Sequence, residues 1–428
     1  MSTSPMLIWR YIHLSHSQIV VSIMLGSLII NRHRDFSIFQ RKRRIPYERS
    51  PSADSLLSSS DRDSDDEGYS DIVREEKSAG FGHRQTIWGV SLDTSRFAGN
   101  LHSRILQKFP FLIEMFYWAL NYVVYTFTKK IAAHAYQLQG SHQVTELAQK
   151  HALDILWVEH DSVFRFFFPF TEVGVQKFFL EHHQSILTAF NQLYSLVHIP
   201  GTVAYVEILK PRCFPTQLTL ISSFLSWYYF VAPNHNAFAT VRRTMTLGNF
   251  AAFFVFAFYP CMPPRLLPKS YGFQDTVRQE NAESVWVKSS AVNQLAAMPS
   301  LHFTYAFTIG CTFLYHSGIL SALVGKVRRQ QARLSALTGA AYAIAAVAYP
   351  ILVLLIIVAT ANHFWLDAVM ATLSVTLSFF CNKIWLVLQP FELLLQLILR
   401  VEKPVPTTGL HRRENVRAES RGRAPSLV

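Results

Sequence analysis

Residues 337–380 read LTGAAYAIAAVAYPILVLLIIVATANHFWLDAVMATLSVTLSFF. This stretch contains one long apolar run, Leu337–Val358, and most of a second, Phe364–Leu388, with the short turn Ala359–Asn362 between them. Each run is as long as the roughly 20 residues that a helix needs to cross the hydrocarbon core of a bilayer. The stretch therefore predicts two consecutive membrane-spanning helices.

Further apolar segments precede this pair. The clear ones are Phe109–Thr128, Ile186–Leu209, Met245–Tyr259 and Phe303–Leu323. Leu218–Val231 is apolar but short, so it is either a seventh span or a re-entrant segment. Gln137–Leu180 mixes polar residues with Leu, Trp and Phe, which is typical of a helical or interfacial insert. The predicted fold class is an all-α polytopic membrane protein with a six-helix transmembrane bundle core, or a seven-helix one if the short segment crosses.

Composition agrees with this class. Only 16% of the 428 residues are charged, against about 25% in soluble domains, and 50% are apolar. These proportions exclude a simple soluble protein and a chain disordered throughout. The net charge of +12 fits the Lys and Arg excess of cytoplasmic loops, so nucleic acid is not an expected partner. The four cysteines are scattered without metal-ligand spacing.

Three regions follow from the pattern along the chain. Residues 1–107 are predicted to be a largely disordered cytoplasmic tail with a short apolar stretch at 19–30, residues 108–389 a transmembrane domain, and residues 390–428 a basic tail. The basic cluster Arg41–Arg44 is either a targeting or lipid-contact patch or, as we favour, a solvated segment that fixes topology. With six spans, both tails lie in the cytoplasm, and Pro260–Ala297 and Ala359–Asn362 lie on the opposite face.

Polar residues gather at predicted span ends on that opposite face. His363 and Asp367 are four apart, so on a helix their side chains share one face. A carboxylate that binds one ring nitrogen leaves the other as a lone pair and stabilises the imidazolium, which makes His363 a candidate nucleophile. The alternative is a His–Asp pair that only packs a helix end.

Two further groupings complete the candidate site. Pro299 suits the first turn of a helix, whose exposed N–H groups around Ser300 would bind phosphate, while His302 is placed to protonate a leaving oxygen. Arg265 lies between prolines and suits phosphate recognition, although an interfacial arginine commonly extends to lipid headgroups instead. Together the groupings predict a phosphoryl-transfer site.

These residues resemble a known family. The runs PSLH at Pro299–His302 and HFWLD at His363–Asp367 look like the type 2 phosphatidic acid phosphatase superfamily. Within it, the chain is most similar to the branch of inositol phosphorylceramide synthases and related inositolphosphotransferases. The branch's motifs read here Met262–Arg265, Ala296–His302 and Thr360–His363, and Asn191–Tyr194 with His198 resembles its second helix.

The resemblance implies a six-helix core in an endomembrane, Golgi or ER, with the active site on the luminal or extracellular face. His363 would be the nucleophile, Asp367 would orient it, His302 would be the general acid, and Arg265 and Ser300 would hold the phosphate. No metal and no cofactor are expected. The chain departs from the superfamily pattern because Ile356 and Ile357 stand where Ser and Arg are usual. Arg242 and Arg243 are alternative phosphate ligands, but positive-inside placement puts them on the wrong face.

The predicted function is that of an integral-membrane lipid phosphotransferase or phosphatase that acts through a phosphohistidine. Its substrate would be a membrane lipid of the phosphatidylinositol, ceramide or phosphatidic acid class. The alternative is a non-catalytic membrane lipid transporter or scaffold with the same core. Catalysis is favoured because the sequence shows no internal repeat of the transporter kind and keeps all three of His302, His363 and Asp367. The hypothesis requires these side chains and Arg265 to cluster at one membrane interface.

Overall fold

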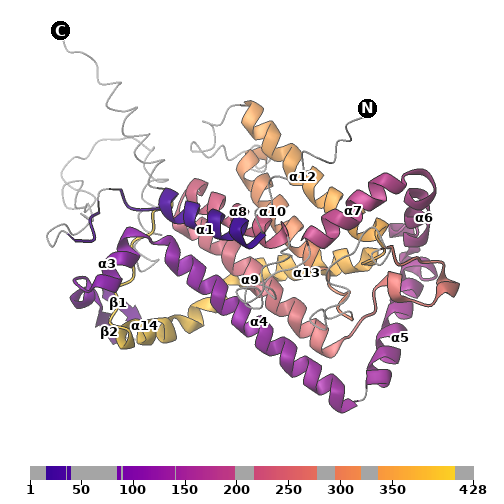
Figure 1. The fold of residues 1–428 in the computed structure, drawn as a ribbon, viewed down its shortest axis with the longest axis horizontal. Helices are drawn as coiled ribbons and strands as arrows, with labels where there is room; N and C mark the ends of the chain where they lie inside the picture. Colours follow the sequence, from indigo (N-terminus) through magenta and orange to yellow (C-terminus); the bar gives the residue numbers. More distant parts are fainter. Residues whose placement is uncertain are drawn as a thin grey trace, which may run out of the picture. The chain divides into compact units, whose positions relative to one another are not determined.

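The computed structural model describes residues 16–34, 36–39, 84–87, 90–139, 141–197, 216–276, 295–319 and 336–409. Most of them are helical (Figure 1). The α-helices are α1 (His16–Ile30), α3 (Leu101–Lys108), α4 (Phe111–Gln139), α5 (Ser141–His160), α6 (Glu172–His182), α7 (Gln184–Val197), α8 (Thr216–Val231), α9 (His235–Phe258), α10 (Leu301–Ser317), α12 (Ala336–Ala359), α13 (Trp365–Cys381) and α14 (Gln389–Ile398).

Short elements connect these helices. Five 3₁₀ helices are η3 (Ser95–Phe97), η4 (Val163–Phe167), η5 (Pro264–Leu266), η6 (Lys269–Tyr271) and η7 (Asn382–Leu388). The strands β1 (Arg84–Ile87) and β2 (Val90–Asp93) pair in antiparallel register, with Arg84 opposite Asp93. The predicted helical class is therefore confirmed, and this small hairpin is an addition that the sequence analysis did not foresee.

Two helical segments have the length and apolar character of membrane spans. Among the described residues these are Leu337–Ala359 and Trp365–Ile398. Both present large apolar side chains outward: Ile344, Val347 and Ile351 on α12 are more than half exposed, as are Leu373 and Leu377 on α13. Outward-facing apolar rows suit acyl chains rather than water. The structure is thus compatible with a membrane protein, and the six-span bundle stays a prediction.

Several helix boundaries differ from the apolar segments. Helix α9 begins at His235, ten residues before the predicted Met245, and includes Arg242 and Arg243. The Asn234 side chain accepts a hydrogen bond from the backbone N–H of Ala237 at 2.8 Å, so a polar cap rather than hydropathy sets the start of the helix. Leu218–Val231 falls within α8, and the predicted insert Gln137–Leu180 is helical in α5, η4 and α6.

The chain divides into two compact units. The first comprises residues 1–24, 118–225 and 240–383, and the second residues 25–117, 226–239 and 384–428. The predicted division into tail, domain and tail stays a prediction, and described parts of both expected tails are folded in the second unit. There, Thr407 donates a hydrogen bond to the backbone carbonyl of Asn31 at 2.8 Å. The basic cluster Arg41–Arg44 lies outside the described residues.

The core of the first unit joins α6, α7, α10, α12 and α13. Phe179, Phe190, Phe303, Ile357 and Ala371 are among its buried side chains. Helices α10 and α12 lie side by side (Figure 1). Their close approach depends on Gly310, because a Cβ atom there would lie 2.7 Å from the carbonyl oxygen of Ala346 and from Pro350. Small residues allow such close backbone packing between membrane helices.

Helix α12 ends in a tight turn that leads to the candidate site. The N–H of Ala361 bonds to the carbonyl of Val358 at 2.8 Å, and that of Asn362 to the carbonyl of Ile357 at 3.0 Å. These two bonds define a Schellman turn, in which one residue adopts the left-handed conformation. Here it is Ala361, with φ at 53°. A residue other than glycine in this region carries strain of about 1–2 kcal/mol.

This strain predicts the effect of two substitutions. We expect Ala361→Gly to change the free energy of unfolding by less than about 1 kcal/mol, because relief of strain offsets the lost buried methyl group and the added chain entropy. Ala361→Val should destabilise by more than about 2 kcal/mol, because a β-branched side chain tolerates positive φ poorly. Thermal unfolding in detergent measures both, with Ala341→Val on the exposed face of α12 as control. Equal effects of the two valine variants would contradict the assignment of strain.

Candidate active site

Four helix ends meet at the site. Helix α9 ends before the segment that carries Arg265, α10 begins at Leu301, α12 ends at Ala359, and α13 begins at Trp365. The segments that follow α9 and precede α10 are joined by backbone bonds: the N–H of Cys261 bonds to the carbonyl of Leu295 at 2.8 Å, and that of Ala297 to the carbonyl of Cys261 at 3.2 Å. The predicted motif residues are therefore brought together within the first unit.

His363 has a defined tautomer. Its Nδ1 lies 2.8 Å from the backbone carbonyl oxygen of Ala297 and 3.0 Å from Oδ2 of Asp367. A carbonyl oxygen only accepts hydrogen bonds, so Nδ1 carries the proton. In the neutral ring Nε2 then holds a lone pair, and this buried atom has no hydrogen-bond partner among the described residues. The geometry thus leaves Nε2 as the ring nitrogen of His363 that could react.

Asp367 is fully buried and supports His363 from the first turn of α13. Its Oδ2 accepts a hydrogen bond from the backbone N–H of Phe364 at 3.0 Å as well as from His363. The predicted pairing of His363 with Asp367 is present, but for a different reason from that given by the sequence. His363 precedes the N-cap Phe364, so the pair lies across a helix start and not on one helical face.

His302 and Tyr194 lie beside His363. The imidazole rings of His302 and His363 have centroids 5.5 Å apart, and the ring of Tyr194 lies 4.5 Å from that of His302. All three residues are buried. The two imidazoles meet edge to face, with 68° between the ring planes, so they are in direct contact. Tyr194, from the Asn191–Tyr194 segment of α7, belongs to the wall of the site.

Ser300 has a structural role that the sequence analysis did not assign. It is the N-cap of α10, and its Oγ accepts a hydrogen bond from the N–H of Phe303 at 3.3 Å. Pro299 was predicted to lie in the first helical turn, but it precedes the N-cap and therefore lies outside the helix. The Ser300 N–H bonds to the backbone carbonyl of Asp367 at 3.2 Å, which ties the starts of α10 and α13 together. A phosphate contact by Ser300 stays a prediction.

Arg265 is anchored to the turn that carries His363. Its Nε donates to Oδ1 of Asn362 at 2.8 Å, and its backbone N–H donates to the carbonyl of Ala361 at 2.8 Å. One guanidinium nitrogen lies 3.4 Å from both carboxylate oxygens of Asp275. The Asn362 amide is fixed in turn by the Thr360 hydroxyl at 2.8 Å. Asp275 and Asn362 thus hold a positive charge beside His363.

Arg242 and Arg243 do not belong to this group of residues. Arg243 precedes the end of α9 at Phe258 by a distance of roughly 22 Å along the helix axis at 1.5 Å per residue. The Arg265 segment follows that end. The two arginines therefore lie toward the opposite end of α9, as the positive-inside argument predicted.

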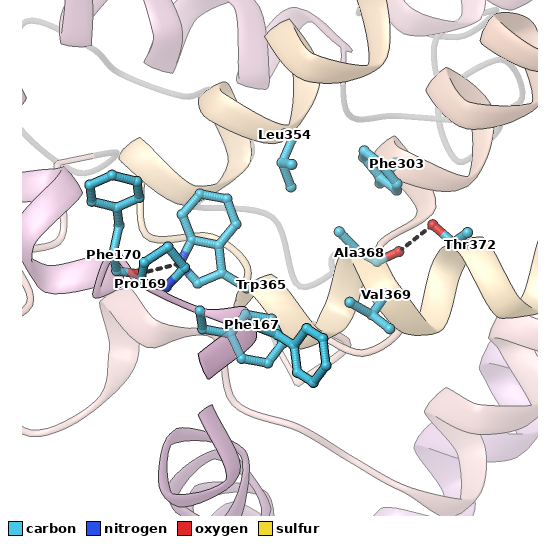
Figure 2. A pocket seen from close by; sticks show the side chains of 10 residues that line it. Phe167, Pro169, Phe170, Phe303, Leu354, Trp365, Ala368, Val369 and Thr372 are labelled. Atoms are coloured by element: carbon cyan, nitrogen blue, oxygen red, sulfur yellow. Dashed lines mark hydrogen bonds between the residues drawn. The ribbon is translucent and has the colours of Figure 1, made fainter. Parts of the chain in front are cut away.

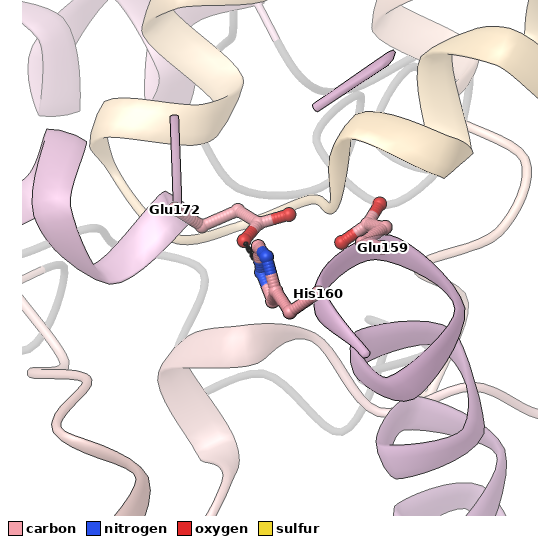
Figure 3. Close-up of side chains that lie close together, drawn as sticks. All are labelled: Glu159, His160 and Glu172. Carbon is pink, nitrogen blue, oxygen red and sulfur yellow. Dashed lines mark hydrogen bonds and ion pairs between the residues drawn. The ribbon is translucent and has the colours of Figure 1, made fainter. Parts of the chain in front are cut away.

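Three side chains behind the site were missed by the sequence analysis. Glu159, His160 and Glu172 lie close together at the start of α13 (Figure 3), and both glutamates are fully buried. Oε1 of Glu159 accepts from the N–H of Leu366 at 2.6 Å, and Oε1 of Glu172 from the N–H of Trp365 at 3.4 Å. The one sequence feature that could have indicated them is the presence of acidic residues beside the Leu, Trp and Phe residues of the insert Gln137–Leu180.

An apolar groove runs along the outer side of the same helix start. Its volume is about 260 Å³, and it is lined by Phe167, Phe168, Pro169, Phe170, Phe303, Leu354, Trp365, Ala368, Val369 and Thr372. Figure 2 shows the indole of Trp365 beside Pro169 and Phe170, with its N–H donating to the Phe170 carbonyl at 2.9 Å. Phe303 and Ala368 follow His302 and Asp367 in the chain, but neither histidine lines the groove.

Comparison with known proteins supports the superfamily resemblance. A model of the PAP2 superfamily matches residues 213–326. This range contains Arg265, Ser300 and His302 but ends before His363 and Asp367. No curated protein and no solved structure matches the chain. Members of the superfamily are phosphoesterases, so the match supports a phosphatase-type enzyme in general.

The anchoring of Arg265 predicts a loss of stability on its removal. Arg265→Ala would remove the donor to the buried Oδ1 of Asn362 and one ion-pair partner of Asp275, which should lower the free energy of unfolding by about 1–3 kcal/mol. Lys269→Ala removes a positive charge from an exposed position nearby and should change it by less than about 0.5 kcal/mol. Thermal unfolding in detergent compares the two. Equal melting temperatures would contradict the anchored geometry.

Proposed function

We propose that the protein is an integral-membrane lipid phosphotransferase or phosphatase that works through a phosphohistidine at His363. The observation that carries this proposal is the buried His363 ring, whose Nδ1 is held by Ala297 and Asp367 and whose Nε2 has no hydrogen-bond partner among the described residues. The ring centroid of His302 lies 5.5 Å from that of His363. A nucleophile oriented by a carboxylate and facing a second proton-transfer group is the arrangement that covalent group transfer requires.

The first half of the reaction forms the phosphoenzyme. Nε2 of His363 attacks phosphorus and forms the P–N bond, while the bond from phosphorus to the lipid oxygen breaks. His302, protonated, gives its proton to that leaving oxygen. The carboxylate of Asp367 stabilises the positive charge that the His363 ring acquires, because both share the Nδ1 proton.

The second half returns the enzyme to its starting state. A hydroxyl group of water or of a polyol gives its proton to the now neutral His302 and attacks phosphorus, and the P–N bond breaks. The acceptor alone decides between hydrolysis and transfer. The similarity of Met262–Arg265 and Ala296–His302 to the inositolphosphotransferase branch favours inositolphosphotransferase-type chemistry over simple hydrolysis.

Arg265 would stabilise the phosphoryl oxygens during both steps. Its guanidinium is anchored through Nε and one terminal nitrogen, so its charge is already in position before a substrate binds. Preorganised charge of this kind costs no reorganisation in the transition state. Near Ser300, phosphate would be bound by backbone N–H groups and not by the Ser300 hydroxyl, because that hydroxyl already caps α10.

The apolar groove supports a lipid substrate. It lies along the start of α13, the helix that carries Asp367, and is lined almost wholly by apolar side chains, which suits an acyl or sphingoid chain of the substrate. Phosphatidic acid, phosphatidylinositol and ceramide-based lipids share this chemistry. We place the site on the luminal or extracellular side of an endomembrane such as that of the Golgi or ER, since the basic segments favour the cytoplasm for the opposite ends of the helices.

Removal of the nucleophile tests the reaction. Purified protein in nanodiscs that contain phosphatidic acid, phosphatidylinositol and ceramide should release phosphate or exchange headgroups, as followed by mass spectrometry. We expect His363→Ala to reduce turnover by at least about a thousandfold. His183→Ala, which removes an exposed histidine, should leave turnover unchanged. Equal turnover in the wild type and His363→Ala would exclude catalysis through His363 and favour the transporter or scaffold hypothesis.

Filling the groove tests the lipid assignment separately. Val369→Trp places a large ring in the groove and should reduce turnover of dioleoyl phosphatidic acid roughly tenfold more than that of the dihexanoyl lipid, because a long chain needs the occupied space. Leu373→Trp, one turn further along α13, changes an exposed side chain outside the groove lining. The assignment fails if Val369→Trp affects both lipids equally.

A further inference from the structure

The start of α13 is held by carboxylates from three elements. The first N–H groups of a helix have no partner within the helix itself. Here the N–H of Phe364 donates to Asp367, that of Trp365 to Glu172 at 3.4 Å, and that of Leu366 to Glu159 at 2.6 Å. Glu172 begins α6 and Glu159 lies in the last turn of α5. The helix that carries Asp367 is therefore fixed from the far side of the site.

The two glutamates share one cationic partner. Oε2 of Glu172 lies 2.8 Å from Nε2 of His160, whose side chain is 22% exposed. Glu159 is fully buried, and its Oε2 has no hydrogen-bond partner with assigned geometry among the described residues. One oxygen or nitrogen from each of the three side chains lies within 4.8 Å of the others (Figure 3). One imidazolium cannot compensate two buried carboxylates and the nearby Asp367.

The charge balance requires a proton on Glu159. Burial, and then the Glu172 carboxylate, raise the pKa of Glu159 far above its usual range. Burial also opposes ionisation of Glu172, but the hydrogen bonds from His160 and Glu159 outweigh it and lower the pKa of Glu172. The hydrogen bond to Glu172 raises the pKa of His160. The charged or titratable groups that act on this cluster are Asp161, Arg165, Cys261 and Asp367.

We propose that Glu159 and Glu172 are positioning residues for His363, with Glu159 as a neutral acid that donates to the Glu172 carboxylate while both hold the start of α13. The proposal rests on the proposed function. Glu159 and Glu172 bind the N–H groups of Leu366 and Trp365 and so hold the start of α13. That helix carries Asp367, which together with the carbonyl of Ala297 holds the His363 ring. A displacement of about 1 Å at a nucleophile costs roughly a hundredfold in rate.

The protonated state makes a distinctive prediction. Gln is isosteric with a protonated Glu, so in Glu159→Gln the amide oxygen accepts from Leu366 and the amide nitrogen donates to Glu172. In the wild type, Glu159 ionises in the unfolded chain near its ordinary pKa but in the folded chain only at its raised pKa, so its contribution to stability falls as the pH rises between the two. Activity falls when Glu159 of the folded protein ionises and places a second negative charge in the cluster. The glutamine variant cannot ionise there and should keep its activity to higher pH.

The experiment uses the full chain in nanodiscs that contain phosphatidic acid, phosphatidylinositol and ceramide. We compare wild type, Glu159→Gln, Glu159→Ala and Glu172→Ala, with Glu146→Ala on the exposed face of α5 as the matched control. Turnover is measured across pH, and hydrogen exchange of the peptide that spans residues 363–370 is measured by mass spectrometry. We expect the two alanine variants to lose roughly 10–100-fold in kcat and to exchange faster at this peptide. Glu159→Gln should stay within about threefold of the wild type at neutral pH.

The outcomes separate this proposal from the proposed function. Faster exchange in the alanine variants with unchanged kcat would overturn the positioning role and leave the enzyme assignment intact. A wild type without turnover would overturn the enzyme assignment, and unchanged exchange would then overturn the anchoring of α13 as well. If Glu159→Gln behaves like Glu159→Ala and loses a bound metal ion that elemental analysis finds in the wild type, the cluster is a cation site and the proton model is wrong.

Discussion

The hydrogen bond from Nδ1 of His363 to the carbonyl oxygen of Ala297 is the contact on which the account of the site depends. If Asp367 were the sole partner of Nδ1, a protonated Asp367 could donate to Nδ1 instead of accepting from it, and the ring proton could then lie on Nε2. A backbone carbonyl does not titrate, so it keeps the proton on Nδ1 and the lone pair on Nε2. The contact also joins the segment before α10 to the turn after α12. The same hydrogen bond thus fixes the tautomer of His363 and helps to bring the helix ends of the site together.

Side chains occupy the first N–H groups of α13 and one of those at the start of α10. Asp367, Glu159 and Glu172 occupy the first N–H groups of α13, and the Ser300 hydroxyl occupies one at α10. Helix starts with free N–H groups commonly bind phosphate. At α13 the carboxylates occupy N–H groups that could otherwise bind an anion, so under the proposed function the fixed guanidinium of Arg265 would be the charge that favours a phosphate. This division explains why Arg265 is held by two partners of its own.

Local spacing allowed part of the site to be predicted from sequence. The pairing of His363 with Asp367 and the nearness of His302 follow from short motifs at the ends of apolar runs, and the apolar run Leu337–Val358 matches α12 almost to the residue. The boundaries of α9 were missed because Asn234 caps the helix well before the apolar run begins. The carbonyl of Ala297 could not be predicted, since any residue supplies one. Glu159 and Glu172 meet α13 across 207 and 193 positions of sequence, and nothing local indicates such contacts.

The most direct test of the central claim is an experimental structure of the protein with orthovanadate, whose five-coordinate form resembles a transferring phosphoryl group. If His363 is the nucleophile, we expect vanadium bonded to Nε2 of His363, an apical oxygen within hydrogen-bond distance of His302, and an equatorial oxygen facing Arg265. Vanadate bound to another side chain, or a His363 ring with Nε2 turned toward Asp367 and Ala297, would contradict it.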